Sequence, residues 1–200
     1  MSRTQVDQAN RAAATVIRPV GPADLPALED FFAGLSAQTR YLRFFGPVRP
    51  TPALLDLLSG RAPGVHAVVA VAGGVIVGHA MASDRPEPEG KPAPRDRPGT
   101  GQTWTTDIGV VVADAWQGRG VGSALMRALT AQASARGVAS LAMDVLHANR
   151  QVLAMIVGHW PDAAVDLSRD SLGIRIPLPK YQPAPPPPAR PVRPLVPAGR

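Results

Sequence analysis

The 200-residue sequence contains no cysteine, which excludes disulfides, thiol nucleophiles and cysteine-ligated metals. Its four histidines, at positions 66, 79, 147 and 159, have no metal-ligand spacing, so we expect no bound metal. It has no run of about 18 apolar residues that could form a membrane helix, and its first residues lack an apolar signal core. These absences predict a cytoplasmic protein without a membrane partner.

Aromatic residues make up only 4% of the chain, but a hydrophobic content of 45% is enough for one core. The net charge is +6, yet most of the excess lies in the last 21 residues, 180–200. Residues 16–179 are close to neutral. We therefore predict no specific nucleic-acid binding, although a basic tail adds weak affinity for polyanions.

Proline and glycine are concentrated in two segments that lack apolar periodicity. Five prolines fall in residues 84–102 and eight in residues 181–200. We predict one domain over residues 16–179 with a flexible insertion at 84–102. The segments 1–15 and 180–200 are predicted to be disordered tails, the second rich in proline and arginine.

Within that domain, apolar periodicity predicts strands and helices of ordinary length. The expected strands are 16–20, 66–71, 75–82, 103–112, 140–146, 163–167 and 173–177. The expected helices are 25–35, 51–59, 121–136 and about 148–158. Ala72-Gly73-Gly74 is a hairpin signal between two of the strands.

One stretch combines an apolar strand with a glycine-rich turn. Ile108–Val112 suits a strand buried on both faces, and glycines follow at 118, 120 and 122. Helical spacing of apolar residues begins at Val121 and ends at Gly137. The free amides at the start of this helix, together with its dipole, predict an anion site that suits phosphate.

Two common phosphate loops do not fit this turn. A Walker loop requires a lysine after its last glycine, and a dinucleotide fingerprint requires a different glycine spacing. The segment Gln117-Gly118-Arg119-Gly120-Val121-Gly122, preceded by Val110-Val111-Val112, instead resembles the acyl-CoA loop of the GNAT superfamily of N-acyltransferases. The likeness in element order extends over about residues 16–177.

The resemblance implies a mixed α/β (α+β) fold with a mostly antiparallel central sheet, flanking helices and two splayed central strands. It also implies that acetyl-CoA is the co-substrate and lies between those strands. The implied cofactor-binding residues are Val110, Val111, Val112, Gln117, Gly118, Arg119, Gly120, Val121, Gly122, Ser123 and Asn149. A pantetheine arm resembles a peptide and can pair with an open strand edge.

A second resemblance concerns Leu35 to Phe45, which is similar to acetyltransferase domains of the bacterial protein-lysine-acetyltransferase type. That region commonly lines the acceptor side, which makes Arg40, Tyr41 and Phe45 candidate substrate-binding residues. The alternative is that its aromatic residues pack a loop onto the core.

The chemistry expected of such a site is direct attack of an amine on a thioester, which needs a proton acceptor. Asp107, at the beginning of the central strand, is the first candidate, and a solvated strand-end carboxylate is the alternative. Asp144 is the second, because a charge within the apolar strand 140–146 is costly unless it is paired or functional.

Two positions depart from the family pattern. Ile156 occupies the position of a tyrosine that serves as the acid in many members, and His159-Trp160-Pro161 replaces the usual Gly-Phe. Three functions therefore remain open. The first is acetyl transfer to a protein lysine or small amine, by a monomer or homodimer. The others are a non-catalytic acyl-CoA-binding regulatory module, and an adaptor whose tail engages a partner.

Overall fold

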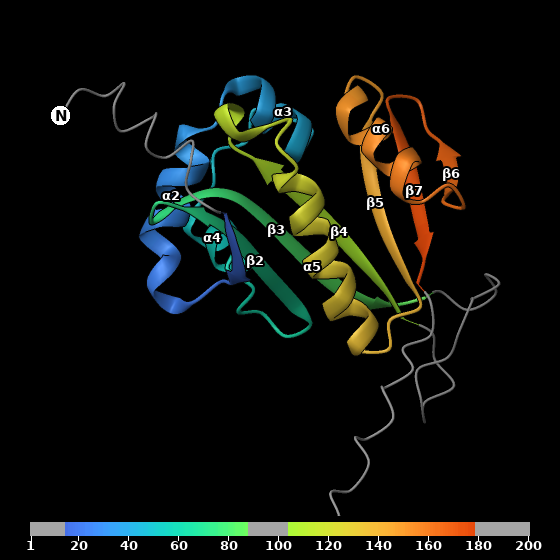
Figure 1. Ribbon diagram of the computed structural model, residues 1–200, viewed down its shortest axis with the longest axis horizontal. Coiled ribbons are helices and arrows are strands. Elements are labelled where there is room, and N and C mark those ends of the chain that lie inside the picture. The colour runs from blue at the N-terminus through green and yellow to red at the C-terminus, as the bar shows by residue number, and fades with distance from the viewer. Residues whose placement is uncertain (1–14, 88–103, 179–200) are drawn as a thin grey trace, which may run out of the picture.

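The computed structural model describes residues 15–87 and 104–178 (Figure 1). Its strands are β1 (Val16–Pro19), β2 (Val65–Ala72), β3 (Val75–Pro86), β4 (Trp104–Val112), β5 (Ser140–Leu146), β6 (Ala164–Leu167) and β7 (Ser171–Pro177). Its α-helices are α2 (Leu25–Gly34), α3 (Ala37–Phe44), α4 (Pro52–Leu58), α5 (Val121–Ala135) and α6 (Arg150–His159). Two short 3-10 helices are η1 (Pro22–Asp24) and η2 (Asp114–Trp116).

The strands form one seven-stranded sheet in the order β1-β2-β3-β4-β5-β7-β6. Every neighbouring pair is antiparallel except β4 and β5, which are parallel. A parallel pair needs a crossover connection, and α5 supplies it. The predicted mixed and mostly antiparallel sheet is therefore confirmed.

The parallel pair at the centre separates along its length. β4 and β5 are paired only from Thr105–Ser140 to Asp107–Ala142, and beyond that point no pairing joins them. β4 nevertheless continues to Val112, held on its other side by β3. Figure 1 shows the two strands close at one end and apart at the other, where α3 and α6 lie. The predicted splay of the central strands is confirmed.

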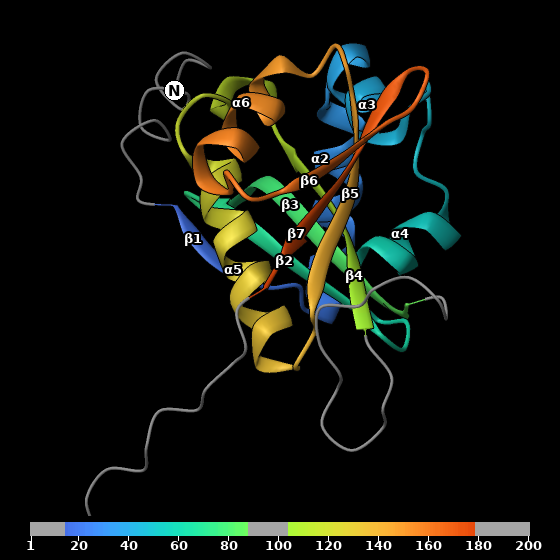
Figure 2. The same cartoon turned by 90° about the vertical axis from the view of Figure 1, so that its right-hand side faces the viewer.

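Helices cover both faces of the sheet, as the turned view in Figure 2 also shows. On one face α5 contributes Val121, Leu125 and Leu129 to a core built on β2 and β3. A side chain at Gly78 of β3 would lie 2.9 Å from the Leu125 side chain, so this glycine lets α5 approach closely. On the other face α2 and α4 bury Leu28, Phe31, Phe32, Leu55 and Leu58 against the same strands. A third core joins α6 to β5 and β7.

The predicted insertion begins too early. β3 continues through Pro86, so residues 84–86 belong to the sheet, where Asp84 pairs with Thr106 and Arg85 with Thr105 of β4. Asp84 also forms an ion pair with Arg136 at 2.9 Å. The charged residues and the proline of this segment suggested a loop, but they belong to a strand in which Asp84 and Arg85 have polar partners. The rest of the predicted insertion, and both predicted tails, lie almost wholly outside the described residues.

The helix α3 was not predicted, because its eight residues are too few for their apolar spacing to be recognised as a helical period. Local capping defines it instead. The Ser36 hydroxyl accepts the Thr39 amide at the N-terminus, and Phe45 takes a left-handed conformation at the C-terminus, with φ of 60°. The segment that carries the second resemblance is therefore helical rather than a loop.

No helix in the described ranges is both long and apolar enough to cross a membrane.

Candidate active site

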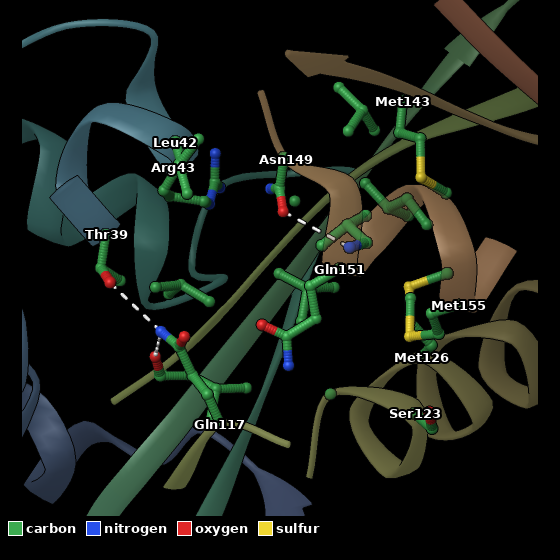
Figure 3. Close-up of a pocket in the computed structure, with 18 of the residues that line it drawn as sticks. Thr39, Leu42, Arg43, Gln117, Ser123, Met126, Met143, Asn149, Gln151 and Met155 are labelled. Atoms are coloured by element: carbon green, nitrogen blue, oxygen red, sulfur yellow. Dashed lines mark hydrogen bonds between the residues drawn. The ribbon is translucent and has the colours of Figure 1, made fainter. Parts of the chain in front are cut away.

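The separation of β4 from β5 opens a cavity of about 640 Å³. Its walls come from α3, β4, the glycine turn, the start of α5, β5 and the start of α6. Figure 3 shows the side chains around it, with Thr39 and Arg43 on α3 and Asn149 and Gln151 at the start of α6. Because β4 has lost its partner there, the backbone edge of Ile108–Val112 that faced β5 is available to a ligand.

The glycine turn closes one end of this cavity. Gly118 and Gly120 have φ of 70° and 79°, in the left-handed region that only glycine adopts readily. Gly120 is the N-cap of α5 and provides no side chain to bond the first helical amides. Those amides therefore remain free for an anion, and the helix dipole favours one. Phosphate binding at this turn stays a prediction, to which the left-handed glycines and the uncapped helix start contribute.

Most of the predicted cofactor residues come together around the cavity. Those that line it are Val110, Val111, Val112, Gln117, Gly118, Gly120, Gly122, Ser123 and Asn149. Val121 instead packs into the core beneath α5, and the Arg119 guanidinium lies 5.5 Å from the centre of the Trp116 ring. Neither of these two side chains is part of the cavity wall.

Gln117 connects the turn to both neighbouring walls. Its side-chain amide donates to the Val112 carbonyl and to the Thr39 hydroxyl, each at 3.1 Å. The side-chain nitrogen is therefore occupied within the protein, and the groups left for a ligand are the side-chain oxygen and the backbone. A glutamine at this position fixes the turn relative to β4 and α3.

Asp114 forms a second connection, which sequence reasoning missed. Its carboxylate accepts hydrogen bonds from the Ser36 amide and hydroxyl and from the Thr39 hydroxyl, at 3.1, 2.7 and 2.8 Å. Burial acts to raise the pKa of Asp114, but these hydrogen bonds lower it overall. No local pattern pairs a residue just after β4 with one 78 positions earlier.

Asp107 lies where β4 and β5 make their last pairing, and it lines the cavity. Its carboxylate accepts hydrogen bonds from Arg85 Nε and Nη2 at 2.5 and 3.2 Å, with both side chains about half exposed. The hydrogen bond to Asp107 raises the pKa of Arg85. The sequence could not reveal this pair while residue 85 was assigned to a flexible insertion.

Asp144 also lines the cavity, but the expected cost of burying its charge does not arise, because the side chain is exposed. It has no ion pair or hydrogen bond to another described residue. Side chains alternate along β5, so Asp144 shares a face with Ala142, which pairs with Asp107. The two carboxylates therefore lie on the same face of the sheet, on either side of the widening gap.

Arg43 is a cavity residue that the sequence analysis did not single out. Its guanidinium lies over Gly109 of β4, where an added Cβ would be only 2.2 Å from Nη2. Nε is shielded from solvent without a hydrogen-bond partner, and burial lowers the pKa of Arg43 to about 10. The available signal was Gly109 itself, because an isolated glycine within a valine-rich strand indicates close approach by another group.

The three predicted substrate-binding residues have different surroundings. Phe45 lines the cavity. Arg40 instead donates to the carbonyls of Ala33 and Leu35 at the end of α2, at 3.2 and 2.6 Å. Neither Arg40 nor the exposed Tyr41 is among the described residues that line the cavity.

Asn149 caps α6, because its side-chain oxygen accepts the Val152 amide at 3.4 Å, while the residue also lines the cavity. Ile156, at the position of the usual tyrosine, is 2% exposed and packs in the core with β5 and β7. The His159 ring bonds to the Met155 carbonyl and is not part of the wall. The titratable side chains in the described wall are Arg43, Asp107 and Asp144.

No group of three or more potential metal ligands occurs within residues 15–87 and 104–178. The site is instead a cleft with free backbone edges, a turn that suits an anion, and a few charged side chains.

Known protein structures share this fold. The GNAT domain of a Streptomyces lividans protein called PAT is 23% identical, with a TM-score of 0.68, over 83% of this chain and 97% of that one. NAA60 from Arabidopsis thaliana, solved with a bisubstrate analogue, is 17% identical, with a TM-score of 0.63, over 84% of this chain and 100% of that one. The putative acetyltransferase yncA from Salmonella typhimurium, solved with acetyl-CoA, is 18% identical, with a TM-score of 0.60, over 86% and 98% of the two chains.

No curated protein sequence matches this chain. The family model described as "Acetyltransferase (GNAT) family" does match, over residues 33–157, which include α3, β4, the glycine turn and most of α6. The chain therefore belongs to the GNAT family of acetyltransferases.

Proposed function

We propose that this protein transfers an acetyl group from acetyl-CoA to a primary amine by direct attack of the amine. The observation that carries the proposal is the cleft between β4 and β5, which ends at the glycine turn. The cleft offers backbone partners for the amides of a pantetheine arm, and the turn offers free helix amides for a pyrophosphate. Solved structures of similar fold with acetyl-CoA support the choice of acyl donor.

The wall residues are sufficient for the reaction without a covalent enzyme intermediate. The amine nitrogen attacks the thioester carbonyl carbon, the carbon–sulfur bond breaks, and CoA leaves as a thiolate that takes up a proton. The amine must lose its own protons, and Asp107, directly or through water, is our candidate acceptor. Asp144 is the alternative on the facing strand.

No described wall residue has the phenol that many relatives use to protonate the thiolate, because Ile156 is buried at that position. The thiol of CoA has a pKa of about 8.5, so its thiolate can take up a proton from solvent. The reaction therefore does not require an enzyme acid. The cleft is open enough for water to enter, as the exposure of Asp144 indicates.

The second candidate function is a regulatory module that binds acyl-CoA without turnover. The buried Ile156 and the ion pair that engages Asp107 favour it. Calorimetry with acetyl-CoA tests the binding that both functions share. Release of free CoA thiol with a panel of amines, polyamines and lysine peptides then separates them. Binding without thiol release for any amine would select the regulatory module, and the absence of binding would reject both.

A further inference from the structure

Arg43 has no acidic partner among the described residues, unlike three arginines that lie on or beside strands of the sheet. Arg85 pairs with Asp107, Arg136 with Asp84 and Arg175 with Glu87. Arg43 has no hydrogen bond or ion pair with any described residue, although its Nε is shielded from water. Its guanidinium carbon lies 5.0 Å from the centre of the Phe44 ring.

Such an arrangement is unfavourable in the absence of a ligand. Nε of this cation has lost its hydration without gaining a hydrogen-bond partner, while the rest of the side chain is only partly buried. The cost is not a by-product of tight packing in the core, because Arg43 lines the cavity. Gly109 accommodates the guanidinium, since any larger residue would displace it. The protein therefore maintains a cation at the wall of the site, ready for an anion.

The position of this cation indicates which reactant carries the anion. Side chains alternate along a strand, so Gly109, over which Arg43 lies, is on the same face of β4 as Asp107. Two residues advance a strand by about 6.6 Å. A carboxylate that suits an ammonium group and a guanidinium that suits a carboxylate are thus placed side by side, and Asp144 lies on the same face of β5.

We propose that the amine acceptor is a small molecule with a carboxylate of its own, as in a free amino acid, and that Arg43 binds this carboxylate. The inference rests on the proposed acetyl transfer and specifies its acceptor. The amine then faces Asp107, and the carboxylate makes paired hydrogen bonds with the guanidinium. A lysine side chain in a protein lacks an adjacent carboxylate and leaves Arg43 without a partner.

The first experiment uses the wild-type full chain with acetyl-CoA and matched pairs of acceptors. Free amino acids, including glycine, β-alanine, 4-aminobutyrate, L-aspartate and L-glutamate, are compared with their carboxamides by thiol release. Rates are expressed per concentration of unprotonated amine, because the carboxamide changes the basicity of the amine. We expect kcat/KM for at least one acid to exceed that of its amide about tenfold or more, as a charge-assisted hydrogen bond allows.

Two substitutions disrupt the same contact from opposite sides. Arg43→Met removes the cation, and Gly109→Ala places a methyl group where the flexible end of Arg43 lies. Both are expected to bring the acid-to-amide ratio close to one. Arg127→Met is the matched control, because Arg127 is an exposed residue of α5 that does not line the cavity. It should retain the wild-type ratio. Thermal melting verifies folding, and the wild-type comparison stands even if a variant fails to fold.

Three results would overturn the inference. The first is a wild type that acetylates amides or lysine peptides as well as it does every acid. The second is an Arg43→Met variant in which acid and amide rates fall equally. The third is a wild type that prefers succinyl-CoA to acetyl-CoA with a neutral amine, a preference lost in Arg43→Met, which would assign the carboxylate to the acyl group. Failure to transfer acetyl to any amine would instead reject the proposed function.

Discussion

The two ends of the cleft are built in different ways. At the glycine turn the groups available to a ligand are mainly backbone amides and a strand edge, and the side-chain nitrogen of Gln117 is occupied within the protein. At the α3 end the groups are the side chains of Arg43, Asp107 and Asp144. Backbone groups suit a part of the ligand that many proteins bind, such as a pyrophosphate. Side chains at the other end can instead specify one acceptor. Five substitutions test whether this division holds.

Asp107→Asn should have the largest effect. Loss of a general base typically lowers turnover about a hundredfold or more. An amine with a pKa of about 10.4 is mostly protonated at pH 7. The loss of turnover should therefore shrink at high pH, where more of the amine is unprotonated. Affinity for acetyl-CoA should hardly change. The measurement is a pH–rate profile of wild type and variant, with calorimetry for binding.

Asp144→Asn is the companion to that variant. Full activity of Asp107→Asn at pH 7, together with a defect in Asp144→Asn, would transfer the role of base to β5. Weakened acetyl-CoA binding in Asp107→Asn would break the proposed division between the two ends.

Gly120→Val tests the backbone end. No protein atom lies within 4 Å of an added Cβ, so the cost of the substitution is the backbone strain of valine at a φ of 79°, and thermal melting verifies that the variant folds. The side chain would occupy the path of an approaching phosphate. We expect acetyl-CoA affinity to fall about tenfold or more. Gly74→Val is the matched control, because Gly74 has a similar φ of 81° and equally open space in the β2–β3 hairpin. Equal affinities of the two variants by calorimetry would show that the turn does not hold the anion.

Asp114→Ala tests how α3 is attached to the turn. It removes the acceptor for three hydrogen bonds, and we expect a loss of about 1 kcal/mol in the free energy of unfolding, since the group is largely exposed. The folded-state pKa of Asp114 is lowered, so its contribution is present above the unfolded pKa of about 3.9 and is lost as pH falls through the folded value. Denaturant melts should show the difference between wild type and variant vanishing in acid. A constant difference at all pH values would assign it to something other than the ionised carboxylate.

Arg40→Met should have the smallest effect. Its guanidinium bonds to carbonyls at the end of α2, so the variant should lose roughly 0.5–1 kcal/mol of stability by thermal melting. The sequence predicts instead that Arg40 contacts the acceptor. A rise in KM for the acceptor without a change in melting temperature would support that role and extend the acceptor site beyond the cavity wall.

The backbone end could be predicted because its signal is local. Glycine spacing from 118 to 122 sets dihedrals and exposes amides within a few residues, and the preceding valines form the strand that the turn follows. The fold class could be predicted for the same reason, since strand and helix periods are also local properties. The splay of β4 and β5 was expected only through the family resemblance.

The acceptor end depends on contacts that no local pattern encodes. Arg85 reaches Asp107 because β3 extends beyond a point where proline and charge suggested a loop. The side chain of Asp144 is exposed because β5 is no longer paired with β4 at that position. Arg43 matters because α3 places it over a glycine 66 positions later in the sequence. Each of these facts requires the register of the sheet, which single-sequence reasoning does not supply.

The hydrogen bonds that meet at Thr39 have a thermodynamic consequence. This residue of α3 receives a hydrogen bond from Gln117, which follows η2, and donates one to Asp114, the first residue of η2. A ligand that orders the glycine turn therefore also stabilises the wall that faces the acceptor. Because coupling between two sites is reciprocal, the acceptor must strengthen acyl-CoA binding by the same factor. The two substrates of the proposed reaction should therefore bind synergistically, each raising the affinity for the other.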